Sequence, residues 1–134
     1  MSSIETIEGI GETYAEKLRA ADIQTVTDLL ERTKTPSGRT ELSETTGFST
    51  DTIRDWANMA DLMRINGVGG QYAELLEKSG VDTVKELRNR NAENLAVKMG
   101  EINAEKNLVN RVPSLDEVTK WIEEANELDP MMEY

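Results

Sequence analysis

The feature of this chain that most constrains its fold is an internal repeat. Gly9-Ile10-Gly11 is followed by apolar residues at helical spacing, and the same pattern starts again 58 positions later at Gly67-Val68-Gly69. The matched pairs are Ile7 and Ile65, Tyr14 and Tyr72, Ala15 and Ala73, Leu18 and Leu76, Val26 and Val84, and Leu29 and Leu87. Two glycines in a turn between apolar helical segments allow the helices to pack closely. The repeat therefore predicts two related helical units.

Two tryptophans extend the repeat to the end of each unit. Trp56 and Trp121 are 65 positions apart, and tryptophan is rare enough that matched positions indicate duplication of the whole unit. The offset changes along the chain because the first copy has extra residues near 33–38 and the second has an insert at about 101–113. The expected domains are residues 1–63 and residues 64–134.

Local signals predict five helices in each unit. In the first copy we expect helices over 3–7 and about 12–20, a third starting at Thr25, a short fourth over 42–46 ended by Gly47, and a fifth starting at Ser49. In the second copy the third helix starts at Thr83, the fourth covers 95–99 and ends at Gly100, and the fifth starts at Ser114. Thr83 with Glu86 fits a capping box, and Thr25 with Asp28 gives a weaker version. Residues 33–38 indicate a loop, and residues 128–134 are expected to fray. The expected fold class is all-α, with two tandem five-helix units packed as one rigid body.

Composition excludes several classes of function. The 134 residues include no cysteine and no histidine, so disulfides, thiolate metal sites and the commonest general base are absent. No stretch approaches the roughly 18 apolar residues that span a membrane. We therefore expect a cytoplasmic, non-catalytic protein without metal, cofactor or membrane partner, present as a monomer or a homodimer.

The distribution of charge separates the two halves. The net charge is −11, which opposes binding to nucleic acid because such affinity comes largely from basic residues that neutralise phosphates. Residues 78–120, however, contain eight basic and seven acidic residues. The first glycine turn lies instead among Glu5, Glu8, Glu12 and Glu16. An anionic ligand is therefore favoured in the second half.

The glycine turn and the residues after it resemble a known motif. Gly9-Ile10-Gly11 with Ala15-Glu16-Lys17-Leu18 resembles the helix-hairpin-helix motif. The run through Thr25-Val26, Leu29, Leu42, Gly47-Phe48-Ser49 and Ile53 resembles the five-helix, SAM-like N-terminal domain of archaeal RadA-type recombinases. Related domains occur at the C-terminus of the RNA polymerase alpha subunit, and the two-copy arrangement resembles small tandem helix-hairpin-helix proteins of unknown function. The resemblance implies a binding role, since such domains bind DNA in some proteins and other proteins elsewhere.

The resemblance also implies which residues would bind. In members that bind DNA, the hairpin amides hold a backbone phosphate without reading sequence, and a basic residue usually follows the second glycine. Carried over, the second hairpin gives a nucleic-acid-binding site of Arg64, Gly67, Val68, Gly69, Gly70, Gln71 and Lys78. The first hairpin, Gly9, Ile10 and Gly11, gives a weaker site because Glu12 follows it and would repel a phosphate. The second departs from the pattern less severely, with Gly70-Gln71 in that place.

Two functional interpretations follow. One is a non-catalytic module that contacts the DNA or RNA backbone without sequence preference, mainly through the second hairpin. The other is an acidic adaptor that binds another protein, in which the hairpin glycines serve only close helix packing. Tyr14, Tyr72, Trp56 and Trp121 match inward-facing stripes, so we expect them in the core rather than as stacking platforms.

Overall fold

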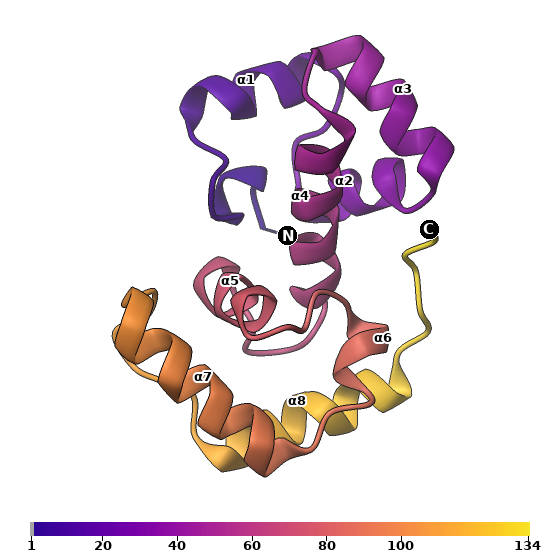
Figure 1. Ribbon diagram of the computed structural model, residues 1–134. Helices are drawn as coiled ribbons and strands as arrows, with labels where there is room; N and C mark the ends of the chain where they lie inside the picture. Colours follow the sequence, from indigo (N-terminus) through magenta and orange to yellow (C-terminus); the bar gives the residue numbers. More distant parts are fainter. Residues whose placement is uncertain (1) are drawn as a thin grey trace. The chain divides into compact units, whose positions relative to one another are not determined.

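The computed structural model describes residues 2–134, and this part of the chain is helical (Figure 1). It contains the 3-10 helix η1 (Ile4–Thr6) and the α-helices α1 (Glu12–Ala20), α2 (Val26–Thr33), α3 (Pro36–Thr46), α4 (Thr50–Leu62), α5 (Gly70–Lys78), α6 (Val84–Leu87), α7 (Ala92–Lys106) and α8 (Leu115–Glu127). Within residues 2–134 there is no strand, although Ser3 and Thr25 form an isolated bridge. None of the helices in that range is long and apolar enough to cross a membrane. The prediction of an all-α fold is confirmed.

The chain divides into two compact units. Unit 1 extends to Asp61 and also includes Met131–Tyr134, and unit 2 comprises Leu62–Pro130. In unit 1, α2 packs against α3, and η1 packs against both α1 and α2. The aliphatic side chains with no exposed surface in this unit include Ile4, Leu18, Ile23, Leu29, Leu42 and Ile53. Each contributes about 1.5–3 kcal/mol through burial, so a core with few aromatic residues is sufficient.

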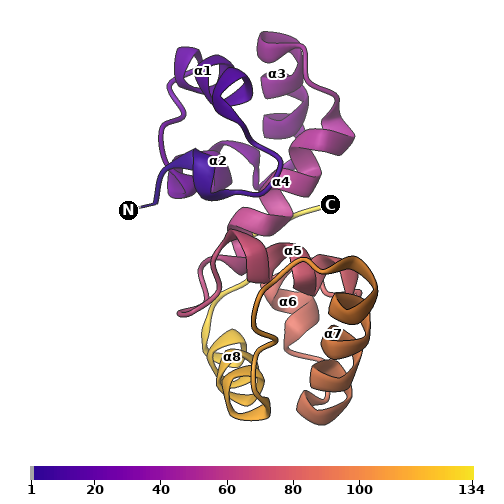
Figure 2. The ribbon, with the colours of Figure 1, turned by 90° about the vertical axis from the view of Figure 1, so that its left-hand side faces the viewer.

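Unit 2 is built in a corresponding way. Helix α8 packs against α6 and α7, and α7 also packs against α5 (Figure 2). The fully buried side chains of this unit include Leu76, Val81, Leu87, Met99 and Val118. The first three are the repeat equivalents of Leu18, Ile23 and Leu29. The apolar spacing shared by the copies therefore places the same positions in each core.

Helices α1 and α5, which correspond to each other in the repeat, are followed by the same kind of turn. The chain turns through a left-handed residue at Asp22 (φ 65°) after α1 and at Gly80 (φ 97°) after α5. The amide of the next residue then donates to the carbonyl five positions earlier, at 3.0 Å in unit 1 and 2.9 Å in unit 2. This bond gives the carbonyl a second donor, beside the amide of Ala21 in unit 1 or of Ser79 in unit 2.

The strengths of the two capping boxes are the reverse of the prediction. Thr25 Oγ1 accepts from the Asp28 amide at 3.0 Å, and the Asp28 carboxylate accepts from the Thr25 amide at 3.2 Å. Thr83 Oγ1 likewise accepts from the Glu86 amide, but the Glu86 carboxylate accepts from the Arg90 guanidinium at 2.9 Å. A charge-assisted bond to an arginine one turn away competes with the backbone amide for this carboxylate. The prediction of a better box in the second copy was wrong.

Two predicted helix boundaries were also wrong. Residues 33–38 are not a loop throughout, because α3 begins at Pro36 with Thr35 as its N-cap. Proline suits the first helical position, where its missing amide is not needed. Gly100 does not end the fourth helix of unit 2, because α7 continues past it to a left-handed end at Asn107 (φ 52°). A single helical glycine costs only about 1 kcal/mol, which packing against α5 and α8 offsets.

Candidate functional site

The second hairpin is a tight turn whose backbone conformation requires glycine at position 67. Gly67 has φ +90°, a conformation that residues with a Cβ rarely adopt. A Cβ there would also lie 3.3 Å from the indole Nε1 of Trp121. Trp121 is buried, and its ring centroid is 5.4 Å from that of Tyr72. The turn therefore packs on the tryptophan of its own unit.

The first hairpin has the same local construction. Gly9 has φ +92°, and a Cβ there would lie 3.8 Å from Nε1 of Trp56. Trp56 is also buried, and its ring centroid is 5.8 Å from that of Tyr14. The two tryptophans thus occupy equivalent places, and the prediction that both are core residues is confirmed.

The start of α5 leaves backbone amides available. Gly69 has an extended backbone (φ −93°, ψ −171°), and no side chain caps the helix that follows it. The first amides of a helix have no partner within the helix and carry the positive end of its dipole. An anion can bind them without displacing a side chain. Gly11 begins α1 with nearly the same backbone angles, but Glu12 lies in that first turn.

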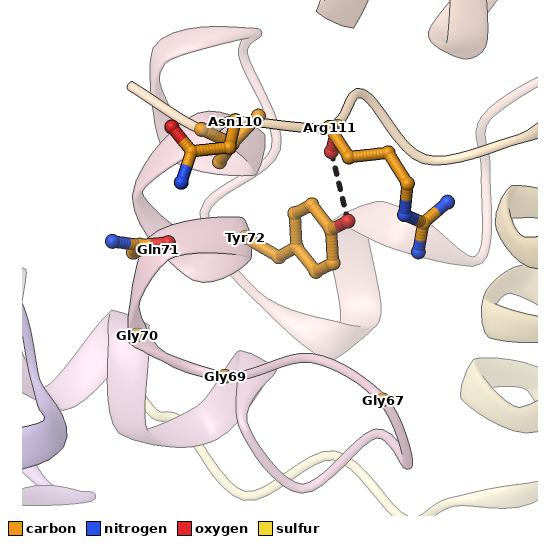
Figure 3. Close-up of a pocket in the computed structure, with 8 residues that line it drawn as sticks. Gly67, Gly69, Gly70, Gln71, Tyr72, Asn110 and Arg111 are labelled. Atoms are coloured by element: carbon orange, nitrogen blue, oxygen red, sulfur yellow. Dashed lines mark hydrogen bonds between the residues drawn. The ribbon is translucent and has the colours of Figure 1, made fainter.

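A pocket of about 430 Å³ lies beside the second hairpin (Figure 3). The hairpin and the start of α5 supply Gly67, Gly69, Gly70, Gln71 and Tyr72, and the other wall consists of Val109, Asn110 and Arg111. In Figure 3 the ring of Tyr72 stands between the glycine turn and the segment that carries Arg111. This second wall belongs to the insert that the sequence places only in the second copy.

Hydrogen bonds hold the part of the insert that follows α7, residues 107–113, in this position. The side chain of Asn103 on α7 donates to the Val109 carbonyl at 3.0 Å and accepts from the Val109 amide at 2.9 Å. The Tyr72 hydroxyl donates to the Arg111 carbonyl at 2.8 Å. The insert is therefore fixed at both α7 and α5, and the pocket is preformed.

Charged groups around the pocket are partly neutralised. The Arg111 guanidinium donates to both carboxylate oxygens of Glu117, at 2.7 and 3.0 Å. This hydrogen bonding lowers the pKa of Glu117 to about 2, with help from the Ser114 amide, and raises the pKa of Arg111. The Glu124 carboxylate accepts from the Asn66 amide at 3.1 Å, within the second hairpin itself. An anion at the start of α5 would thus meet one paired arginine and one nearby carboxylate.

The structure brings together some of the predicted binding residues and separates others. Gly67, Gly69, Gly70 and Gln71 line the pocket, whereas Val68 is buried. Arg64 donates to the carbonyl of Asp129 at 2.7 Å and does not line the pocket. Lys78 is the last residue of α5, about 12 Å along the helix from the pocket residues at its start. The glycine turn is therefore the part of the predicted site that coincides with a cavity.

Sequence reasoning missed Tyr72, Val109, Asn110 and Arg111 as pocket residues. Tyr72 was expected in the core, but it is only partly buried and its hydroxyl reaches the insert. The signal that could have located the others was the position of the insert, directly before the capped start of α8. Residues added between two helices of a small bundle must cover a neighbouring surface, and here they cover the start of α5.

The expectation that Tyr14, just after the first hairpin, lies in the core was wrong. It is 45% exposed rather than a core residue. Its ring lies against Phe48 and Trp56, with centroids 5.2 and 5.8 Å away. Phe48 and Trp56 are themselves in edge-to-face contact at 5.1 Å. These two rings occupy the inner positions, so Tyr14 covers them from outside.

We expect replacement of Asn103 by alanine to loosen the insert. Both hydrogen bonds to Val109 would be lost, at a cost of about 1–3 kcal/mol for two partly buried bonds. Amide hydrogen exchange measured by NMR should show lost protection at Val109 while the amides of α5 stay protected. Asn126→Ala is the matched control, since its exposed side chain donates to a carbonyl within its own helix. Unchanged protection of Val109 would show that other contacts hold the insert.

The chain was compared with known proteins. No curated protein matches it, and no solved structure matches it. A protein family described as a domain of unknown function (DUF4332) matches residues 8–128, which include both hairpins, both tryptophans and the insert. The chain belongs to this family of domains of unknown function, DUF4332.

Proposed function

We propose that this chain is a non-catalytic tandem helix-hairpin-helix protein that contacts the nucleic-acid backbone without sequence preference, through its second hairpin. The observation that carries the proposal is the uncapped start of α5, which opens into a preformed pocket. The equivalent start of α1 in unit 1 has the same backbone but an acidic residue in its first turn. Of the two hairpins, the second is therefore the better anion ligand.

The chemistry of this site favours backbone contact over base reading. Amides at a helix start bind phosphate oxygens and carry no information about sequence. The pocket also has few side chains that could donate or accept at a base edge, namely Gln71, Asn110 and Arg111. The pairing of Arg111 with Glu117 lowers its value as a phosphate ligand. The proposed interaction is consequently weak and involves one or two phosphates.

A salt titration tests the proposal. Filter binding of labelled single-stranded and duplex DNA should detect complexes near 50 mM salt, with log K falling against log salt at a slope of roughly −1 to −2. The slope is shallow because each phosphate contact contributes about −0.7 to −0.9. Oligonucleotides of unrelated sequence should bind equally. Absence of binding near 50 mM salt, or strong dependence on sequence, would contradict the proposal.

The acidic adaptor is the second candidate, and two observations favour it. The net charge is −11, and the Glu124 carboxylate already occupies an amide of the second hairpin. In this case both glycine turns serve packing on their tryptophans, and the acidic surface meets a basic protein. A pulldown with nuclease treatment distinguishes the candidates. Basic protein partners that survive digestion of nucleic acid would favour the adaptor.

A further inference from the structure

Unit 1 contains a buried arginine that is bound to the C-terminal segment. Arg39 on α3 is 5% exposed. Its guanidinium donates to the Thr33 carbonyl at 2.8 Å and to the Glu133 carbonyl at 2.6 Å. The same guanidinium lies 5.5 Å from the centre of the Tyr134 ring, in a cation–π arrangement. Burial lowers the pKa of Arg39, so its charge needs these partners.

The last two residues are held as a bound peptide would be. The Glu133 amide donates to the Lys34 carbonyl at 2.8 Å, so both backbone groups of Glu133 are paired. The Tyr134 hydroxyl donates to Oδ1 of Asn58 on α4 at 2.7 Å. We name Lys34, Arg39 and Asn58 the tail site. The expectation that residues 128–134 fray is corrected for these two residues.

The contacts of the tail site determine which residues of a bound segment it recognises. At position 133 both hydrogen bonds go to the backbone, which every residue except proline can supply in full, and the Glu133 carboxylate also attracts the Arg39 guanidinium electrostatically. At position 134 it contacts one face of an aromatic ring and the phenolic hydroxyl, the combination that tyrosine supplies, while the residue stays 67% exposed. A cavity of about 260 Å³ adjoins the Tyr134 ring and is lined by Pro36, Arg39, Thr40, Thr50, Asp51 and Arg54. The tail site thus has space beside the ring as well as specific contacts to it.

We propose that the tail site is a peptide-reading site for an extended segment in which tyrosine follows an acidic residue, and that residues 131–134 of the same chain occupy it. The buried Arg39 supports this assignment, because removing the Glu133 carbonyl would leave Nη2 of a buried guanidinium without that hydrogen bond and only Nη1 bonded to Thr33. An occupant that supplies a carbonyl and an aromatic face is therefore favoured over an empty site. A segment of the same chain has an effective concentration in the millimolar range, so a competing peptide is excluded while the tail is bound.

Binding in trans tests the proposal in the 134-residue chain. In the double variant Glu133→Pro/Tyr134→Ala, proline removes the amide that Lys34 accepts and alanine removes the ring, so the tail site is vacated. A fluorescein-labelled peptide with the sequence of residues 128–134 should bind this variant at least about tenfold more tightly than it binds the unmodified chain. Fluorescence anisotropy measures both affinities. Circular dichroism and thermal unfolding establish that the variant is folded.

Variants of the labelled peptide identify which of its side chains the tail site recognises. Replacing the tyrosine of the labelled peptide by alanine should weaken binding about tenfold or more, since it removes a hydrogen bond and a cation–π contact. Replacing the glutamate by alanine should weaken binding less than the tyrosine change does, since the peptide backbone keeps both hydrogen bonds and only the attraction between the carboxylate and Arg39 is lost. Failure of the peptide to bind the folded double variant would overturn the proposal. Equal binding of the tyrosine and alanine peptides would do the same.

A conservative variant provides a second, independent readout. Tyr134→Phe keeps the ring and removes only the hydroxyl, so the fold should persist while the NMR resonances of the Asn58 side-chain amide shift. Unshifted resonances would count against the assigned contact. Light scattering of the unmodified chain should show no dimer that the double variant lacks. Such a dimer would place the tail in a second copy and overturn the arrangement within one chain.

Discussion

Replacing Gly69 by aspartate is expected to reduce the affinity for nucleic acid at least tenfold without loss of folding. Gly69 has an extended backbone that aspartate adopts readily, and an added Cβ would meet no atom within 4 Å. Aspartate at an N-cap accepts from the amides of the first turn and commonly stabilises a helix. The same carboxylate would occupy the proposed phosphate site and repel an anion. The variant therefore separates binding from stability.

Gly11→Asp is the matched control for this variant. Gly11 has nearly the same backbone angles, and a Cβ there also has open space around it. Because the first hairpin is the weaker site, Gly11→Asp should retain most of the affinity measured by filter binding. Equal losses in the two variants would indicate that general electrostatic repulsion governs binding. Equal affinities of both variants and the unmodified chain would remove the second hairpin from the proposed function.

Replacing Trp121 by alanine is expected to destabilise the protein by about 3–5 kcal/mol. The side chain is 4% exposed and supports both the Gly67 turn and the Tyr72 ring, so its removal leaves a cavity under the hairpin. Trp56→Ala should cost a similar amount, because Trp56 supports Gly9 and contacts Phe48 and Tyr14. Losses of this size are a large fraction of the 5–15 kcal/mol typical of folded domains.

Urea denaturation followed by circular dichroism measures these changes. Leu115→Ala is a suitable control on α8, since Leu115 is 45% exposed and surface substitutions usually change stability by less than about 0.5 kcal/mol. A loss below 1.5 kcal/mol for either tryptophan variant would show that the hairpin does not depend on the ring beneath it. A large difference between the two variants would show that the units use the matched tryptophans differently.

The parts of the fold that could be predicted from sequence are those that recur in both copies. Spacing of apolar residues located the buried faces, and the matched tryptophans are both buried as expected. The helix starts at Thr25, Thr83 and Ser114 could be predicted because a capping side chain acts on amides within three residues. These features depend on short-range chemistry, which the sequence displays directly.

The parts that could not be predicted depend on contacts between segments distant in sequence. Helix α7 passes through Gly100 because packing against α5 and α8 offsets the low helix propensity of glycine. Arg64 donates to the carbonyl of Asp129, 65 positions later in the sequence, which no local pattern indicated. Glu86 and Arg90 are only four positions apart, so this competing contact was present in the sequence and was missed. The position of the pocket wall could not be predicted either, because the insert has no counterpart in the first copy.

The attachment of this wall has a practical consequence for engineering. Residues 107–113 follow the end of α7, precede the capping residue of α8, and are anchored mainly through Asn103 and Tyr72. Randomising position 110 while keeping these anchors would alter the chemistry facing the glycine turn and leave the helices intact. The second unit thus offers a scaffold for display libraries, with the first unit of the same chain as a built-in reference that lacks the variable segment.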